Sequence, residues 1–165
     1  MLGSIALMAA AAAAAPPNAV PDILGGLEGC WNAPGEVRGK DARSVMRGDW
    51  HIGCLYFMLQ LHSVGPGKPY RAAIIYGGGT KPGTIYSYWL DVLGGAAPVP
   101  ETGSATRDGF TIVYDFGDLL YTNRFKKAGK EWRWTIMERV KGRQEKLFAK
   151  YDLTPTTCKG KTFDF

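Results

Sequence analysis

The chain has 165 residues, of which 45% are hydrophobic, 12% aromatic and 21% charged. This length fits one domain, and the composition allows a buried core, which excludes a disordered chain. The net charge of +5 is unevenly distributed, because residues 1–123 hold 8 Lys/Arg against 10 Asp/Glu, whereas residues 124–161 hold 12 against 4. Such asymmetry can attract an anionic surface, although the solvated outer face of the last strands would give the same pattern.

The N-terminal segment predicts export. Residues Met1 to Ala15 carry no charged side chain and end in seven alanines. The segment is shorter than the roughly 20 apolar residues of a transmembrane helix but matches the apolar region and small-residue cleavage site of a secretory signal. The usual positive charge near Met1 is missing, so an alanine-rich start without such a role is the alternative. We expect a signal peptide at 1–14, a lead-in at 15–26, a domain at 27–165, no transmembrane segment, and a periplasmic or secreted protein.

The rest of the chain predicts short antiparallel strands. Apolar and polar residues alternate with period two between turns rich in glycine and proline. Segment 21–27 predicts one helical turn, and Asp108-Gly109 is a strong hairpin signal. The expected strands are Leu27–Ala33, Arg38–Arg47, Gly53–Ser63, Tyr70–Tyr76, Thr84–Val92, Ser104–Arg107, Phe110–Phe116, Leu120–Lys126, Glu131–Arg139 and Glu145–Leu153, with a long loop at 94–104.

These strands favour an all-β fold with a single antiparallel up-and-down barrel of about ten strands. No segment is long enough for the crossovers of a parallel sheet. Closure into a barrel also removes the two exposed edges that an open meander would leave.

The three cysteines predict one disulfide. None forms a CxxC pair, and with only two histidines we expect no metal site. An oxidising compartment favours one bridge and one free thiol, although all three could be buried small hydrophobes. Because the first and last strands of an up-and-down barrel are neighbours, we expect Cys30 to pair with Cys158. Cys54 should lie two strands further round, at about 10 Å, beyond the roughly 7 Å Cα limit for a bridge. A mobile tail would allow Cys54–Cys158 instead.

Several segments together resemble a known bacterial pattern. They are LEGCW at 27–31, Gly35, YRAAIIYGGGTKPGTIYSYWLDVLGG at 70–95, TRDGFTIVYDF at 106–116 and WRWTIMERVKGRQEKLFAKYDL at 132–153. In this order they resemble lipocalin-like barrel families of unknown function, whose first strand reads L-x-G-x-W. The resemblance implies a calycin-type barrel akin to fatty-acid-binding proteins and to haem-binding nitrobindin-like domains. The haem-binding domains use a late histidine, whereas His51 and His62 are both early here.

The candidate ligand-binding residues are aromatic or charged positions on expected strands. Trp31 should fill the barrel floor, as it does in lipocalin-type barrels, with direct ligand contact as the alternative. Trp132, Trp134, Ile136 and Glu138 share the more apolar face of their strand, which we therefore expect to point inward. Glu138 would then be a carboxylate near a cavity, with Arg124 or Tyr88 as its partner, unless it lies in water at the rim.

Two faces of the expected strand at 84–92 compete for the interior. Trp89 and Asp91 share one face, and Tyr86 and Tyr88 share the other, so either could line a pocket. Large rings with polar tips suit a mostly apolar pocket with a few orienting donors. The candidate ligand-binding set is Trp31, Trp89, Asp91, Arg124, Trp134 and Glu138.

The sequence contains no motif typical of a catalytic site. Neither His51 nor His62 lies in a nucleophile motif, and Gly77-Gly78-Gly79 does not precede a helix as a phosphate loop would. We therefore expect no catalytic residue and no cofactor. The basic aromatic run RFKKAGKEWRW could suggest nucleic acid, but export argues against that partner.

We expect an exported, non-enzymatic binding protein for a small apolar or amphiphilic molecule. The alternative is an envelope interaction protein with a filled barrel, whose basic C-terminal strands bind anionic surfaces. An enzyme that uses the region of Glu138 comes last.

Overall fold

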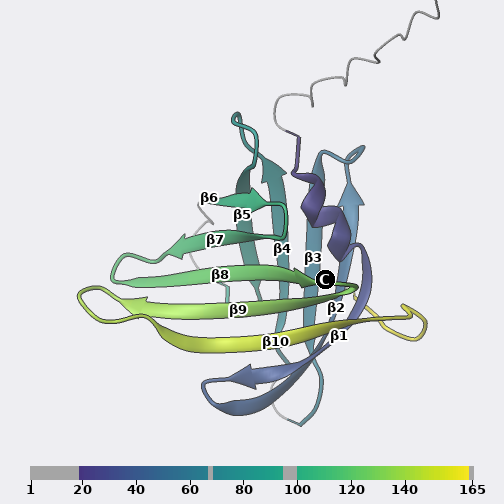
Figure 1. Cartoon of the computed structure of the whole chain (residues 1–165). Helices are drawn as coiled ribbons and strands as arrows, with labels where there is room; N and C mark the ends of the chain where they lie inside the picture. Colours follow the sequence, from purple (N-terminus) through teal and green to yellow (C-terminus); the bar gives the residue numbers. More distant parts are fainter. Residues whose placement is uncertain (1–18, 67–68, 95–99, 164–165) are drawn as a thin grey trace, which may run out of the picture.

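The protein folds as one closed antiparallel barrel of ten strands in the computed structural model, which describes residues 19–66, 69–94 and 100–163 (Figure 1). Each strand pairs with the next in sequence, and β1 pairs with β10. A 3-10 helix, η1 (Asp22–Leu27), precedes the barrel. The strands are β1 (Gly29–Val37), β2 (Lys40–His51), β3 (Tyr56–Ser63), β4 (Arg71–Gly78), β5 (Thr84–Asp91), β6 (Glu101–Thr106), β7 (Gly109–Asp115), β8 (Leu119–Ala128), β9 (Glu131–Val140) and β10 (Lys146–Thr156). The predicted fold class is therefore confirmed, whereas the predicted signal at 1–14 lies outside the described residues.

The starts of β1, β2, β3 and β6 differ from the sequence prediction by two or three residues. Arg38 does not begin β2 but lies in the β1–β2 turn with φ of 51°, and Cys54 does not belong to β3 but lies in the preceding turn with φ of 65°. Such left-handed residues cannot continue a strand. β6 begins at Glu101, inside the predicted loop, because Glu101 pairs with Ser87 of β5.

Four aromatic rings form a ladder across the interior wall. Phe110, Phe125, Trp134 and Tyr151 are directly opposed residues on β7, β8, β9 and β10. Their successive ring centroids lie 4.5, 5.0 and 5.2 Å apart, and all three pairs are stacked. Each such pair contributes about 0.5–1.5 kcal/mol beyond its buried area, so the ladder helps to set the register of these strands.

Helix η1 covers one end of the barrel. The indole Nε1 of Trp31 donates to the Leu27 carbonyl at 2.8 Å, and that of Trp132 donates to the Gly26 carbonyl at 2.9 Å. A Cβ at Gly26 would lie only 2.9 Å from the Trp132 ring, and a Cβ at Gly48 only 2.2 Å from the Leu27 carbonyl oxygen. The two glycines thus let the helix sit close against the strands.

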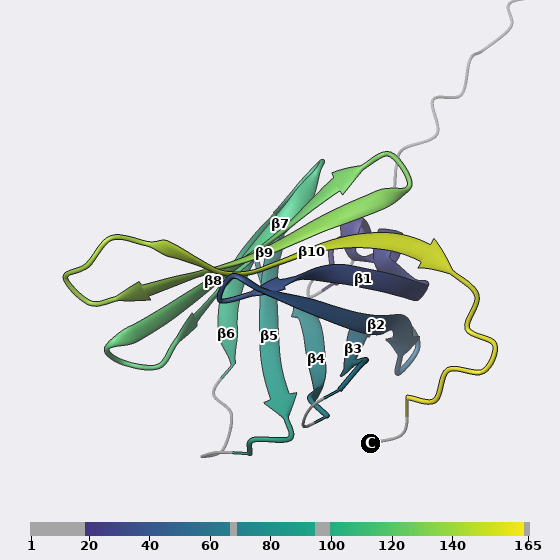
Figure 2. The ribbon, with the colours of Figure 1, turned by 90° about the horizontal axis from the view of Figure 1, so that it is seen from below.

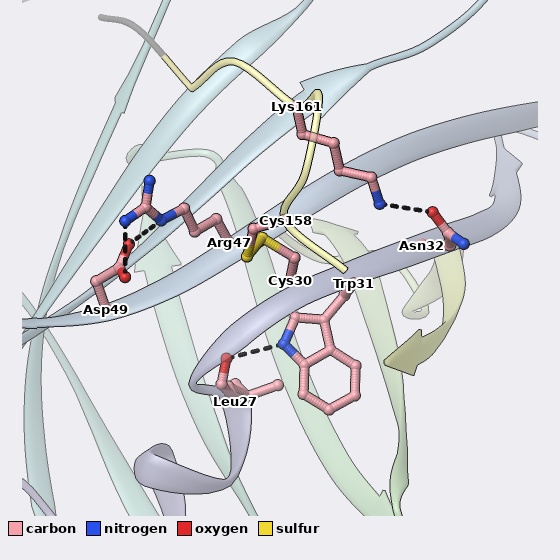
Figure 3. Close-up of a disulfide and its surroundings, with 8 residues drawn as sticks. All are labelled: Leu27, Cys30, Trp31, Asn32, Arg47, Asp49, Cys158 and Lys161. Atoms are coloured by element: carbon pink, nitrogen blue, oxygen red, sulfur yellow. Dashed lines mark hydrogen bonds and ion pairs between the residues drawn. A yellow bond between two sulfur atoms is a disulfide. The ribbon is translucent and has the colours of Figure 1, made fainter. Parts of the chain in front are cut away.

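The C-terminal tail crosses the outside of the barrel. The predicted Cys30–Cys158 disulfide is present, with Cα atoms 5.3 Å apart (Figure 3). Cys54 is free and exposed. Beyond the bridge, Lys161 Nζ donates to Asn32 Oδ1 at 3.0 Å, and Gln60 Nε2 donates to the Phe163 carbonyl at 3.2 Å. The tail therefore runs from β10 across β1 to the outer face of β3 (Figure 2).

Reducing this disulfide should destabilise the protein. In the chain-entropy model a bridge across 128 residues contributes up to about 4–5 kcal/mol to the free energy of unfolding. Urea unfolding of the Cys158→Ser variant should show a loss of this order, and dithiothreitol should change the wild type but not the variant. The Cys54→Ser control should match the wild type. Equal stability of Cys158→Ser and wild type would show that the bridge stabilises nothing.

Candidate functional site

The barrel end opposite η1, which we call the mouth, carries polar side chains that face inward. Glu138 on β9 is the buried carboxylate there, with its side chain only 5% exposed. Its directly opposed neighbours are Tyr121 on β8 and Lys146 on β10. The inward face of β9 that was predicted from its alternation is confirmed, because Trp132, Trp134, Ile136 and Glu138 are all buried.

Three donors hold the Glu138 carboxylate. Arg38 Nη2 lies 2.9 Å and the Tyr121 hydroxyl 3.1 Å from Oε2, while Lys146 Nζ lies 3.1 Å from Oε1. Burial raises the pKa of Glu138, but the hydrogen bonds from Lys146 and Tyr121 and the charge of Arg38 outweigh it and leave the pKa below its ordinary value. Glu138 is therefore an ionised acceptor rather than a proton donor.

Phe148 on β10 contacts Arg38 through both its backbone and its ring. β10 carries a bulge between Leu147 and Ala149, so Phe148 is an additional residue in the ladder with β9. Its carbonyl accepts the Arg38 backbone N–H at 2.7 Å, and the Arg38 guanidinium carbon lies 4.8 Å from the centre of its ring. The turn, the bulge and the ring together aim Arg38 across the mouth.

A second polar group lies on the β4–β5 side of the mouth. The Tyr70 hydroxyl donates to Asp91 Oδ2 at 2.8 Å, and Trp89 Nε1 lies 3.3 Å from the same oxygen. Asp91 Oδ1 accepts the backbone N–H of Leu93 at 2.8 Å. Burial, with the neighbouring Asp91 carboxylate, raises the pKa of Tyr70 well above its ordinary value, so this hydroxyl stays neutral.

Aromatic rings connect this second group to the core. The Trp89 ring lies 6.0 Å from Trp134 of the ladder and 5.5 Å from Tyr114. The Tyr114 hydroxyl in turn shares a 2.6 Å hydrogen bond with Ser87. Trp89, Tyr70, Tyr121 and Phe148 are only partly buried, unlike Trp31, Phe57 and Trp132 nearer η1. The mouth therefore presents aromatic surface together with two carboxylates that are already engaged by donors.

The structure separates the six predicted site residues. Glu138, Trp89 and Asp91 lie at the mouth, Trp134 lies in the ladder below them, and Trp31 lies at the η1 end. On β5 the alternation resolves in favour of Trp89 and Asp91, since Tyr86 is exposed and Ser87 is fully buried.

Both suggested partners of Glu138 are wrong. Arg124 lies on the outer face, opposite Thr135, and forms an exposed ion pair with Glu145 at 3.1 Å. Tyr88 points outward with Tyr86, because residues two apart on a strand share a face.

Sequence reasoning missed Arg38, Lys146, Tyr121, Phe148 and Tyr70. The β8–β9 hairpin, extended back from its turn at 129–130, would have placed Tyr121 opposite Glu138. The bulge that aligns Lys146 and the turn that aims Arg38 had no comparable signal in the sequence.

Among the described residues, no three His, Cys, Asp or Glu side chains form a cluster that could hold a metal ion. In the same part of the chain, no helix is long and apolar enough to cross a membrane.

Comparison with known proteins supports the barrel fold but identifies no family for this chain. No family model matches the chain, and no curated protein matches it. Among solved structures, it resembles the crystal structure of Rv2717c from M. tuberculosis, with a TM-score of 0.57 and 16% sequence identity over 82% of this chain and 96% of that one. At this identity the likeness supports the barrel fold alone.

Replacing Glu138 should remove a pH-dependent part of the stability. Since the folded state lowers the pKa of this carboxyl, its contribution is present above the ordinary value of about 4.3 and is lost as pH falls through the folded value. At pH 7 the Glu138→Gln variant should lose about 1–3 kcal/mol of unfolding free energy, and the difference should vanish in acid.

The matched control is Glu145→Gln, which removes an exposed ion pair and should cost less than about 1 kcal/mol. Chemical denaturation from neutral to acidic pH measures both variants. A Glu138→Gln deficit that persists unchanged in acid would contradict the ionised, paired state.

Proposed function

We propose that this chain is an exported binding protein that holds a small amphiphilic molecule at the mouth of the barrel. The observation that carries the proposal is the contrast between the two ends. Trp132, Trp134 and Phe57 are at most 2% exposed, so side chains fill the barrel toward η1. At the mouth, partly buried rings surround engaged polar groups, which is the mixture of apolar surface and few polar atoms typical of ligand sites.

The mouth favours a ligand with an anionic head. Arg38 and Lys146 have side chains that are 61% and 65% exposed, and both point at the single buried carboxylate of Glu138. Around Glu138, two cations face one carboxylate, which gives this side of the mouth a local excess of positive charge, while Asp91 lies on the β4–β5 side. Arg38 also retains donors for a second carboxylate or phosphate. The apolar part of the ligand would lie against Tyr121, Phe148 and Trp89.

Export is supported by the alanine-rich start of the sequence and by the disulfide, since disulfides persist in oxidising compartments. The resemblance to lipocalin-like barrels agrees with a binding role, although fold by itself does not assign function. Histidine-ligated haem does not fit this interior. His51 is the exposed last residue of β2, and His62 lies on the outer face of β3, where its ring contacts Phe163.

The alternative function, surface binding by the basic C-terminal strands as a whole, has weaker support. On the outer wall Arg124 pairs with Glu145 and Arg133 pairs with Asp152 at 2.8 Å, so part of the positive charge is neutralised. That alternative also gives no role to the partly exposed rings of the mouth.

A fluorescent fatty acid, dansylamino-undecanoic acid, tests the proposal. The wild type should bind it saturably, with energy transfer from tryptophan to the dansyl group, because Trp89 lies at the mouth. Arg38→Gln should weaken binding about tenfold or more through loss of a charged hydrogen bond. The methyl ester of the probe should bind the two proteins equally.

Arg47→Gln is the matched control, since it removes the same charge from the outer wall, where Arg47 pairs with Asp49 at 2.6 Å. Native mass spectrometry of protein purified from its own host gives an independent reading of a bound molecule. Absence of saturable binding by the wild type, with no co-purifying molecule, would refute the proposed function.

A further inference from the structure

Two hairpin ends project beside the mouth. They are the turn at 116–118 between β7 and β8 and the turn at 141–145 between β9 and β10, which we call the hairpin tips. Both views show them side by side at the left of the molecule (Figures 1 and 2). The Lys141 N–H donates to the Asp118 carbonyl at 2.8 Å, which joins one tip to the other.

The outer side of the hairpin tips is a basic groove of about 450 Å³. Its charged lining is Arg139, Lys141 and Arg143, against the single carboxylate of Asp115. Within the described residues none of these three cations takes part in an ion pair, in contrast to Arg124 and Arg133 on the wall below. Asp118 in the 116–118 turn and Glu101, whose Oε1 accepts the Asp115 N–H at 3.2 Å, add negative charge beside the groove but form no ion pair with its three cations.

The inner side of the hairpin tips is apolar. Phe116 is 65% exposed and Val140 is 37% exposed. Leu119 pairs with Val140 on the face that also carries Tyr121 and Glu138. The Phe116 ring lies 6.1 Å from Tyr121, which lies 5.0 Å from Phe148, so an aromatic path leads from the tips into the mouth.

We propose that the hairpin tips dock on the surface of an anionic lipid bilayer, with the three cations on lipid headgroups and Phe116 inserted among the acyl chains. This inference rests on the proposed function and deepens it, because it names the surface from which an amphiphile would enter the mouth. Charge complementarity and the exposed ring select a bilayer, since a soluble anion would use the cations and leave Phe116 in water.

Sedimentation with phosphatidylcholine vesicles, with and without phosphatidylglycerol, tests the docking surface. At low salt the wild type should sediment with the anionic vesicles only, and high salt should release it. The variant Arg139→Gln/Lys141→Gln/Arg143→Gln should lose at least about tenfold in partitioning. Phe116→Ser should lose several-fold without any change of charge.

The matched control is Lys126→Gln/Lys127→Gln/Lys130→Gln, which removes the same charge at the η1 end, where all three residues are exposed. This control should keep most of the binding. A loss as large as that of the tip variant, or no sedimentation of the wild type at low salt, would overturn the inference.

Probe binding tests the mouth site and vesicle binding tests the docking surface, so the two proposals can be refuted independently. The triple charge variant of the tips should bind the dansyl fatty acid normally in the absence of vesicles, since Arg139, Lys141 and Arg143 line the outer groove and not the mouth. Vesicle binding without probe binding would refute the mouth site and leave the docking surface standing, whereas the reverse result would refute only the docking surface.

Discussion

The stacked ladder of Phe110, Phe125, Trp134 and Tyr151 is the constraint on which the rest of the barrel depends. Four consecutive strands contribute one ring each at directly opposed positions. A slip of one residue in any of them would turn its ring outward and its whole set of core residues with it. Because the ladder holds β8 and β9 in register, Glu138, four residues beyond Trp134, meets Tyr121.

The two ends of the barrel satisfy their polar groups differently, and this difference favours one end for binding. At the η1 end, indole N–H groups donate to the helix carbonyls. These hydrogen bonds hold η1 against the barrel and leave the two indole groups with no donor for a ligand. At the mouth, two carboxylates collect donors from turns and neighbouring strands, while the aromatic rings beside them stay partly exposed. The disulfide and the tail connect the end of β10 to β1 and β3.

Cationic side chains lie on the outer wall, at the mouth and at the hairpin tips. On the outer wall, arginines pair with acids, and such exposed pairs contribute little to stability or to long-range attraction. Near the mouth, Arg38 and Lys146 are directed at Glu138, and at the hairpin tips three cations stand without ion pairs in the described structure. The positions of the cations thus favour the hairpin tips, with their three cations and exposed apolar side chains, over the outer wall as a surface that binds anions.

The sequence by itself determined the ten strands, the closed barrel and the inward face of β9, and it favoured the Cys30–Cys158 pair over Cys54–Cys158. These follow from period-two alternation, turn residues and the adjacency of first and last strands, all of which are local or topological. Tertiary structure decided the partners of Glu138 and the inward face of β5. The Phe148 bulge shifts register by one residue, and the left-handed Arg38 aims its side chain across the mouth. Neither feature is periodic, so alternation could not reveal that Arg38 and Lys146 join Tyr121 at one carboxylate.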